Sequence, residues 1–343
     1  MIVDLRSDTV TKPTPEMYRA MAEAELGDNV LENDPTVRKL EDLSCEMTGM
    51  EDALFMPSGT MGNQVALATW TKPGDSVIFE EQAHMIWYEG GGPAIFASVI
   101  TRGLHSTQGV IDPSVLESAI LNRSHHTPGT SLICLENTHN RHGGAITPPE
   151  VHAAYRRIAE DRNVKVHLDG ARVFNASVAL GLPVREIAKH VHSINFCLSK
   201  GLASPIGSIL CGPKDFIEEA VYWRKRLGGG LRQAGILAAC GIVSLTKMVD
   251  RLAEDHQRAG DLASFCTSLP GVKPEPCPTN ILILRTDQPA SWWQSELEKS
   301  GVRTIPFDVH RLRAVFHKDV DDQALECAKS AFAKAADTAS KLS

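Results

Sequence analysis

The sequence lacks an excess of positive charge. It contains 35 Lys and Arg residues against 42 Asp and Glu residues, which gives a formal net charge of -7 at pH 7. A protein that mainly binds nucleic acid or an anionic membrane surface needs a basic face. We therefore expect small molecules and other protein subunits as partners, and we expect neither nucleic acid nor a membrane among them.

Motifs that would indicate metal binding or export are also missing. The 8 cysteines include no C-x-x-C pair and no closely spaced Cys/His set, which predicts reduced thiols and no metal site. No apolar run is long enough to span a bilayer. The first residues, MIVDLRSDTVTKP, do not show the basic and apolar regions of a secretory signal. These absences predict a cytoplasmic protein.

The chain does contain enough apolar material for a large core, with 343 residues of which 43% are hydrophobic. Short, continuously apolar runs alternate with helical stretches through its middle; the runs are DALFMPSG, DSVIFEE, TSLICLENT, NVKVHLDGA, SINFCLSKG and GSILCG. Such runs are typical of buried strands in a mostly parallel sheet with helices on both faces. The fold class predicted for this region is therefore α/β.

The C-terminal part has a different pattern. From about residue 271, the segments NILILRT, ASWWQSELEKSG and VRTIPFDVHRLRAVFH predict a compact α+β unit. A long helical stretch over 235–269 would carry the chain from one domain into the other. We predict an N-terminal segment and large domain over 1–250 and a small C-terminal domain over 251–343.

Polar residues follow the predicted strands, at the edge where open α/β sheets bind ligands. Ser58, Gly59 and Thr60 form a turn between a strand and a helix, where free N–H groups suit a phosphate. The same turn is also an ordinary helix cap. His84 and His139 follow two further strands, and each is open to interpretation as a core or capping histidine.

Three charged residues complete this set. Asp169 and Arg172 follow one strand, where they are also explained as a helix cap and a surface ion-pair partner. Lys200 follows the next strand, and a lone lysine there would be explained by its ammonium reaching solvent. Together, however, a phosphate turn, a histidine, a carboxylate and a lysine are the groups that pyridoxal phosphate requires.

These residues lie in segments that resemble the low-specificity L-threonine aldolases, a family with the aspartate aminotransferase (fold type I) architecture. The segments are DLRSDTVTKPT, MPSGTMGNQVAL, LENTHNR, HLDGARVFNA, CLSKGLASPIGS and RKRLGGGLRQAGILAA. They occur in the family's order over nearly the whole chain. The resemblance implies a large domain with a mostly parallel seven-stranded sheet, a small α+β domain, and pyridoxal phosphate as cofactor.

The resemblance also implies roles in binding the cofactor. Lys200 would form the covalent bond to the cofactor aldehyde, and Asp169 would keep the pyridine nitrogen protonated. His84 would stack on the ring. Ser58, Gly59, Thr60 and Ser199 would hold the phosphate. Arg232, assisted by Lys225, would reach it from a neighbouring subunit.

For the substrate, the resemblance implies that Ser7, Arg172 and Arg313 bind the amino-acid carboxylate, with Arg172 close enough to contact the cofactor as well. His139 would lie near the β-hydroxyl, and it shares with His84 the handling of that proton. The implied reaction is the reversible cleavage of L-threonine, L-allo-threonine and other L-β-hydroxy-α-amino acids into glycine and an aldehyde.

Two positions depart from the family pattern. Leu31 and Glu32 stand where a tyrosine and a glycine are common, and Phe316 adds bulk in the segment of Arg313. In the family, the tyrosine lines the site of a neighbouring subunit. Because Leu31 replaces it, we expect a pocket that accepts larger β-substituents. The same resemblance implies a homotetramer built from two catalytic dimers.

Two other functions remain open at this point. A lyase of the same fold could eliminate a β-substituent instead of breaking the Cα–Cβ bond, because one fold hosts many reactions. A non-catalytic amino-acid sensor would need an appended partner domain, and the sequence predicts none.

Overall fold

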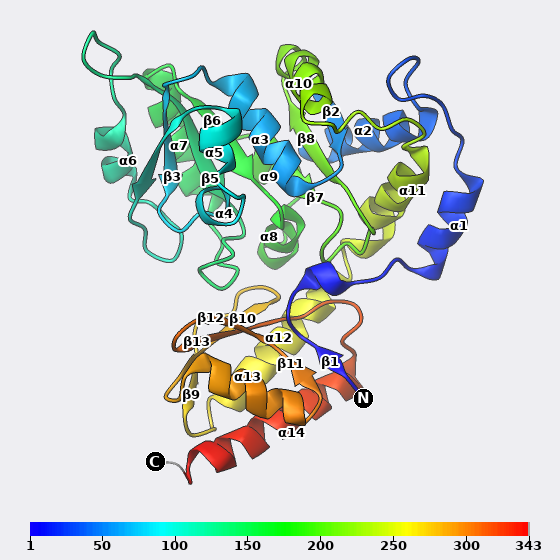
Figure 1. The fold of residues 1–343 in the computed structure, drawn as a ribbon, viewed down its shortest axis with the longest axis vertical. Coiled ribbons are helices and arrows are strands. Elements are labelled where there is room, and N and C mark those ends of the chain that lie inside the picture. Colours follow the sequence, from blue (N-terminus) through cyan, green and yellow to red (C-terminus); the bar gives the residue numbers. More distant parts are fainter. Residues whose placement is uncertain (342–343) are drawn as a thin grey trace.

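The computed structural model describes residues 1–341. Its central element is a seven-stranded sheet with the order β2-β8-β7-β6-β5-β3-β4 (Figure 1). The strands are β2 (Asp52–Met56), β3 (Ser76–Glu80), β4 (Ile100–Leu104), β5 (Thr130–Glu136), β6 (Lys165–Asp169), β7 (Ser193–Cys197) and β8 (Ser208–Gly212). Strand β8 runs antiparallel to both of its neighbours, β2 and β7, and the other six strands share one direction. This confirms the predicted mostly parallel α/β sheet.

Helices cover both faces of this sheet. One face carries α3 (Gly59–Trp70), α5 (Gly92–Phe96) and α10 (Lys214–Arg226). The other carries α2 (Pro35–Thr48), α6 (Pro113–Ala119), α7 (Pro149–Asp161), α8 (Val173–Leu180) and α9 (Val184–Ala188). Side chains along β3 alternate between the two cores: Ile78 joins the α2/α7 side, whereas Val77 and Phe79 join the α3/α5 side.

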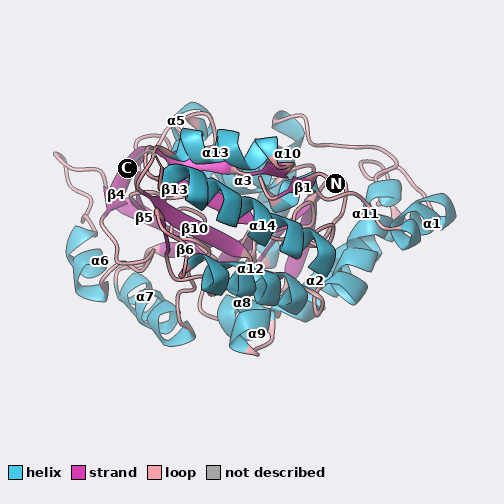
Figure 2. Ribbon diagram, turned by 90° about the horizontal axis from the view of Figure 1, so that it is seen from below, coloured by secondary structure: helices cyan, strands magenta, loops and turns pink. Residues whose placement is uncertain are grey.

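The C-terminal unit is a separate structure (Figure 1), in which helices lie over a small sheet (Figure 2). Its sheet has the order β12-β13-β10-β9, with strands β9 (Val272–Pro274), β10 (Ile281–Thr286), β12 (Ile305–Asp308) and β13 (Arg311–Val315). It packs against α12 (Leu252–Cys266), α13 (Ala290–Lys299) and α14 (Asp322–Ala339). The predicted division at residue 250 stays a prediction, and Leu342 and Ser343 lie outside the described residues.

The beginning of the chain joins this C-terminal unit. Strand β1 (Val3–Asp4) pairs in parallel with β11 (Val302–Arg303). Val3 and Leu5 belong to the same buried cluster as Trp293 and Phe332. The short helix η1 (Asp8–Val10) and α1 (Pro15–Glu23) then lead into the large sheet domain (Figure 1). The N-terminal segment therefore crosses the boundary between the two units.

The helix expected over 235–269 is interrupted, which corrects that prediction. Helix α11 (Gly235–Val243) is followed by a π-helical turn, η2 (Ser244–Met248), and α12 begins only at Leu252. Ser244 is fully buried, and its hydroxyl donates a hydrogen bond to the carbonyl of Leu202 over 2.7 Å. The irregular turn therefore touches the loop that carries Lys200.

All eight cysteines are free thiols. Within residues 1–341, no helix combines the length and the apolar character that crossing a membrane would require.

Candidate active site

Five of the residues predicted to form the site meet in one cavity of about 500 Å³. They are Ser7, His84, Arg172, Lys200 and Arg313. The remaining lining residues include Tyr88 and Asn140 from the large domain and Phe307 from β12. The cavity therefore lies where the carboxyl edge of the large sheet faces the C-terminal unit.

The loop after β7 brings Lys200 to this cavity. The strand ends at Cys197, and Lys200 follows three residues later. The hydroxyl of Thr11 donates a hydrogen bond of 3.0 Å to the carbonyl of Lys200, which ties the loop to the N-terminal segment. Gly201 packs closely on Leu252, because a Cβ atom at this position would lie 2.9 Å from that side chain. Ser199 is half-buried beside Lys200.

Asp169 ends the neighbouring strand β6 and is 2% exposed. Its Oδ1 accepts a hydrogen bond from the backbone N–H of Ala171, and its Oδ2 accepts one from Asn63, both over 3.0 Å. A ring nitrogen of His84 and a carboxylate oxygen of Asp169 lie within 4.8 Å of each other. A buried carboxylate thus stands next to the histidine that lines the cavity.

Arg172 is held by Asp8, a residue that the sequence analysis did not single out. Two hydrogen bonds of 2.7 Å join the guanidinium to the carboxylate, and the side chain of Asp8 is fully buried. Burial raises the pKa of Asp8, but the charge and hydrogen bonds of Arg172 outweigh it and hold this pKa below its ordinary value. The only signal in the sequence was an acid one residue after the predicted site residue Ser7.

Arg313 reaches the cavity from β13. It donates to the side-chain oxygen of Asn140 over 2.9 Å and to the carbonyl of Arg6 over 3.1 Å. Its Nε is buried and has no hydrogen-bond partner among the described residues. Burial, together with the charge of Arg172, lowers the pKa of Arg313 to about 10. The buried Nε–H of Arg313 lacks a partner, and Arg172 lines the same cavity. This pair of guanidinium groups is suited to an anionic ligand such as a carboxylate.

His84 begins the short helix α4 (His84–Trp87) and its side chain is 30% exposed. Its backbone N–H donates to Glu136 over 2.7 Å, and its Nδ1 lies 3.2 Å from a carboxylate oxygen of Glu89. Burial lowers the pKa of His84, but the hydrogen bond to Glu89 and the charges of Asp169 and Glu136 outweigh burial. The net effect is a raised pKa. The imidazole therefore holds its proton more strongly than usual.

The predicted phosphate turn lies at the start of α3. Ser58 is the N-cap residue, and its hydroxyl accepts a hydrogen bond of 3.1 Å from the backbone N–H of Met61. Ser58 and Thr60 are exposed. A Cβ atom at Gly62 would overlap the side-chain amide of Asn195, so this glycine lets the helix approach β7. The turn is thus a helix cap, and the start of a helix remains suited to an anion.

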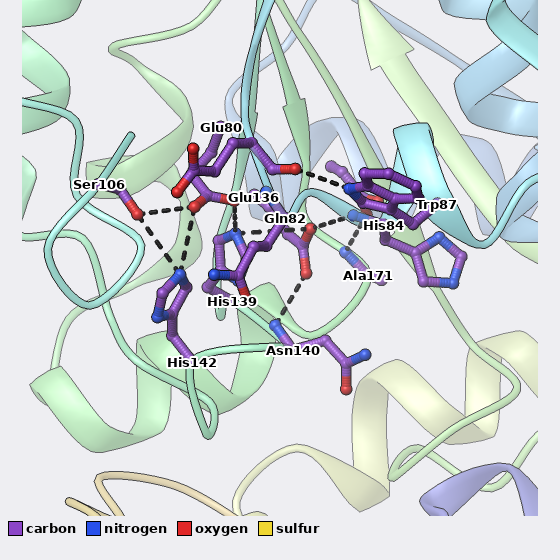
Figure 3. A network of polar contacts seen from close by, with 12 residues as sticks. Glu80, Gln82, His84, Trp87, Ser106, Glu136, His139, Asn140, His142 and Ala171 are labelled. Carbon is purple, nitrogen blue, oxygen red and sulfur yellow. Dashed lines mark hydrogen bonds and ion pairs between the residues drawn. The ribbon is translucent and has the colours of Figure 1, made fainter. Parts of the chain in front are cut away.

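His139, which is predicted to lie near the substrate hydroxyl, belongs to a buried polar cluster. It is 1% exposed, and its Nε2 lies 2.9 Å from Glu80 (Figure 3). Among the described residues, Asn140 lines the Lys200 cavity and His139 does not. Its role towards the substrate therefore stays a prediction.

Three predicted residues lie elsewhere on the surface. Leu31 is 80% exposed, Lys225 is exposed, and Arg232 pairs with Asp28 at 3.2 Å. Within the described part of the chain, none of these three lines the Lys200 cavity. Phe316 is expected to add bulk beside Arg313, but it is fully buried in the core of the C-terminal unit. It is not one of the described residues that line the Lys200 cavity.

The sheet order and the position of this cavity define the fold as type I of the pyridoxal-phosphate enzymes, as the sequence predicted. A solved threonine aldolase from Leishmania major superimposes with a TM-score of 0.82 at 18% sequence identity, covering 99% of both chains.

Sequence comparison places the chain within that class. A family model described as beta-eliminating lyase matches residues 4–289. The chain is 40% identical over 342 residues to a probable low-specificity L-threonine aldolase 2 from Arabidopsis thaliana, covering 97% of this chain and 96% of that protein. It is 38% identical to the low specificity L-threonine aldolase of Escherichia coli K12, covering 94% and 96%. The chain therefore belongs to the beta-eliminating lyase family, together with the low-specificity L-threonine aldolases.

Proposed function

We propose that this protein is a pyridoxal-phosphate-dependent aldolase that cleaves L-threonine, L-allo-threonine and other L-β-hydroxy-α-amino acids reversibly into glycine and an aldehyde. The observation that carries the proposal is one cavity that joins Lys200 to two guanidinium groups, Arg172 and Arg313. His84, which also lines this cavity, has the buried carboxylate of Asp169 within 4.8 Å. The names of the relatives at 38–40% identity support the same reaction.

These residues fit the cofactor. Lys200 offers a primary amine inside the cavity, and Asp169 is a buried carboxylate that suits a protonated ring nitrogen. The start of α3, with Ser58, Gly59 and Thr60, offers N–H groups for the phosphate. When bound, pyridoxal phosphate supplies the electron sink for bond cleavage at the substrate's Cα.

The chain's own residues bind and orient the substrate. Arg313, with its unpartnered Nε, and Arg172 bind the amino-acid carboxylate, assisted by Ser7. Asp8 fixes Arg172 in place through two hydrogen bonds, which reduces the cost of ordering it on binding. His84 and His139 share the proton of the β-hydroxyl, and His84 is the one that reaches the cavity.

A panel of β-hydroxy amino acids, with aldehyde and glycine measured together, tests this function. We expect equal amounts of acetaldehyde and glycine from L-threonine. Lys200→Ala should abolish this activity and the visible absorption of the lysine-bound cofactor, whereas Lys189→Ala, at a lysine that pairs with Glu186 on the surface, should change neither. Release of ammonia and a keto acid would contradict the aldolase proposal and favour β-elimination, the reaction in the family's description.

The substrate range depends on a residue from a neighbouring subunit in this proposal. Leu31 is 80% exposed, which suits a side chain that enters the partner's site within a catalytic dimer. In this proposal, two such dimers form a homotetramer in the cytoplasm. An apolar side chain there favours large β-substituents. We expect Leu31→Tyr to lower the turnover of phenylserine relative to threonine. An unchanged ratio of the two turnover numbers would count against this assignment.

A further inference from the structure

A second group of titratable side chains lies outside the Lys200 cavity. Glu80 ends β3, and His139 and His142 stand three residues apart in the loop after β5 (Figure 3). Nε2 of His139 lies 2.9 Å from one carboxylate oxygen of Glu80, and Nε2 of His142 lies 3.2 Å from the other. One ligand atom from each of the three residues lies within 4.8 Å of the others.

This cluster is buried but accessible from one side. The side chains of His139 and Glu80 are 1% and 3% exposed, and that of His142 is 18% exposed. His142 lines a second cavity of about 760 Å³, together with Gln82 and Thr107. The charged residues of that cavity come from the C-terminal unit; they are Lys273, Glu275, Arg285 and Arg311. Solvent and ions therefore have a route to the cluster that does not pass through the Lys200 cavity.

The donor atoms are held in place by their surroundings. The two oxygens of Glu80 also accept hydrogen bonds from the backbone N–H of Gln82 over 2.6 Å and from the hydroxyl of Ser106 over 2.7 Å. The backbone N–H of His139 donates to Ala145 over 2.8 Å, which closes the loop that carries both histidines. Gly109 packs directly on the ring of His139, where a Cβ atom would approach to 2.9 Å. The cluster is therefore preorganised.

Two imidazoles and one carboxylate are a ligand set of zinc sites that keep a fourth position open. Around a tetrahedral ion with bonds of about 2.0–2.1 Å, neighbouring ligand atoms are about 3.3 Å apart. Each imidazole nitrogen lies close to this spacing from one oxygen of Glu80, Nε2 of His139 at 2.9 Å from Oε2 and Nε2 of His142 at 3.2 Å from Oε1. Ser106, 3.4 Å from Nε2 of His142, adds an oxygen on the same side.

We propose that Glu80, His139 and His142 bind a divalent transition-metal ion of the zinc type, with its fourth position facing the second cavity. In this site, Nε2 of His139 is a ligand of the ion. Its binding therefore withdraws this imidazole from the proton handling assigned above and inhibits threonine cleavage. The inhibition rests on the proposed function, whereas the binding site does not.

Zinc binding by the purified full-length protein, made without a histidine tag and stripped with a chelator, tests the site directly. We expect one Zn²⁺ per chain in calorimetry or in competition with a chromophoric chelator. Glu80→Gln and His142→Asn should each weaken it more than about a hundredfold, beyond the 10- to 100-fold typical of residues that only support a ligand. The matched controls are Glu81→Gln and His105→Asn, an exposed Glu–His pair 2.7 Å apart, which should bind Zn²⁺ like wild type.

Two results would overturn the site. One is the absence of saturable Zn²⁺ binding, which would leave the cluster as a hydrogen-bonded network. The other is loss of binding in Glu89→Gln with retention in His142→Asn, which would move the ion to the set formed by His84, Glu89 and Asp169. Inhibition by Zn²⁺ is measured separately as acetaldehyde release. If wild type binds Zn²⁺ but never cleaves threonine, the proposed function fails and the metal site stands.

Discussion

At the scale of single residues, Asp8 determines how the candidate site is held together. Its carboxylate is fully buried and makes two hydrogen bonds to Arg172 and a third, of 3.3 Å, with Asn280. A buried pair contributes little compared with apolar packing, but loss of one partner leaves an uncompensated charge in the interior. Asp8 therefore couples the N-terminal segment to the large domain through one ion pair.

Asp8→Asn should lower the free energy of unfolding by about 3–5 kcal/mol, because Arg172 then remains buried without its counter-charge. Urea denaturation followed by fluorescence measures this change. The control is Asp4→Asn, which removes a partly exposed pair with Arg6, whose side chain is 43% exposed, and should cost no more than about 1 kcal/mol. Equal losses in the two variants would contradict the special position of Asp8.

The same ion pair predicts a pH dependence of stability. Folding lowers the pKa of Asp8, so its stabilisation is present above the ordinary Asp pKa of about 3.9 and is lost as the pH falls below that value. Wild type should therefore lose stability more steeply than Asp8→Asn as the pH falls below about 4. Parallel acid-unfolding curves for the two proteins would argue that Asp8 is not ionised in the folded state.

His84 gives a second prediction at this scale. Glu89, 3.2 Å from Nδ1, contributes to the raised pKa of His84. If the unprotonated imidazole accepts the hydroxyl proton, Glu89→Gln should move the acidic limb of kcat/KM to lower pH, because the hydrogen bond that raises the pKa of His84 is weakened. The pH–rate profile for threonine cleavage measures this shift. Glu81→Gln is the control on an exposed carboxylate, and a limb that stays fixed in both variants would assign it to another group.

At the scale of elements, the start of α3 is positioned by its contact with β7. A Cβ atom at Gly62 would overlap Asn195, whereas Gly260 in α12 has nothing within 4 Å of the same position. Gly62→Ala should therefore destabilise the protein by about 1–3 kcal/mol and weaken cofactor binding, because the predicted phosphate turn moves with the helix. Gly260→Ala should stabilise it by about 0.5–1 kcal/mol. Calorimetry measures the stability of the two variants, and titration measures their cofactor binding. Unchanged stability and cofactor binding in Gly62→Ala would refute the close packing.

The elements that could be predicted from sequence are those with a continuous apolar signal. Strands such as Thr130–Glu136 and Lys165–Asp169 are buried on both faces and read as apolar runs. Strand β4, with the sequence ITRGL, lies at the sheet's edge and is mostly exposed, so it carries no such run and escaped prediction. The break after α11 was also missed, because it depends on a buried contact between Ser244 and Leu202, 42 residues apart.

The same distinction applies to the candidate site. Lys200 and Asp169 could be predicted because Asp169 is the last residue of a buried strand and Lys200 lies three residues after the next one, and parallel strands bring their carboxyl ends together. Asp8 could not, since its partner Arg172 is 164 residues away. Glu80 was missed for the same reason, as it meets His139 across 59 positions of sequence. Long-range pairs of this kind leave no local pattern.

At the scale of the whole molecule, one surface carries the predicted residues that do not reach their own chain's cavity. The backbone of Asn29 donates to the carbonyl of Arg232 over 3.0 Å, which places the loop of Leu31 against the glycine-rich loop after α10. Leu31 and Arg232 are both exposed there. Side chains that the family resemblance predicts for the site but that face solvent here are explained if this surface faces a second subunit related by twofold symmetry.

Subunit mixing tests this arrangement. In a dimer with shared sites, a Lys200→Ala subunit paired with an Arg232→Ala subunit has one site with both defects and one site with neither. Random pairing should therefore restore about a quarter of wild-type activity, although neither parent is fully active. Lys200→Ala mixed with Asp169→Asn is the control, because both residues serve the same chain's cavity and every mixed site stays defective. Activity in the first mixture that never exceeds the average of its parents, under conditions where subunits exchange, would place Arg232 outside the neighbouring site.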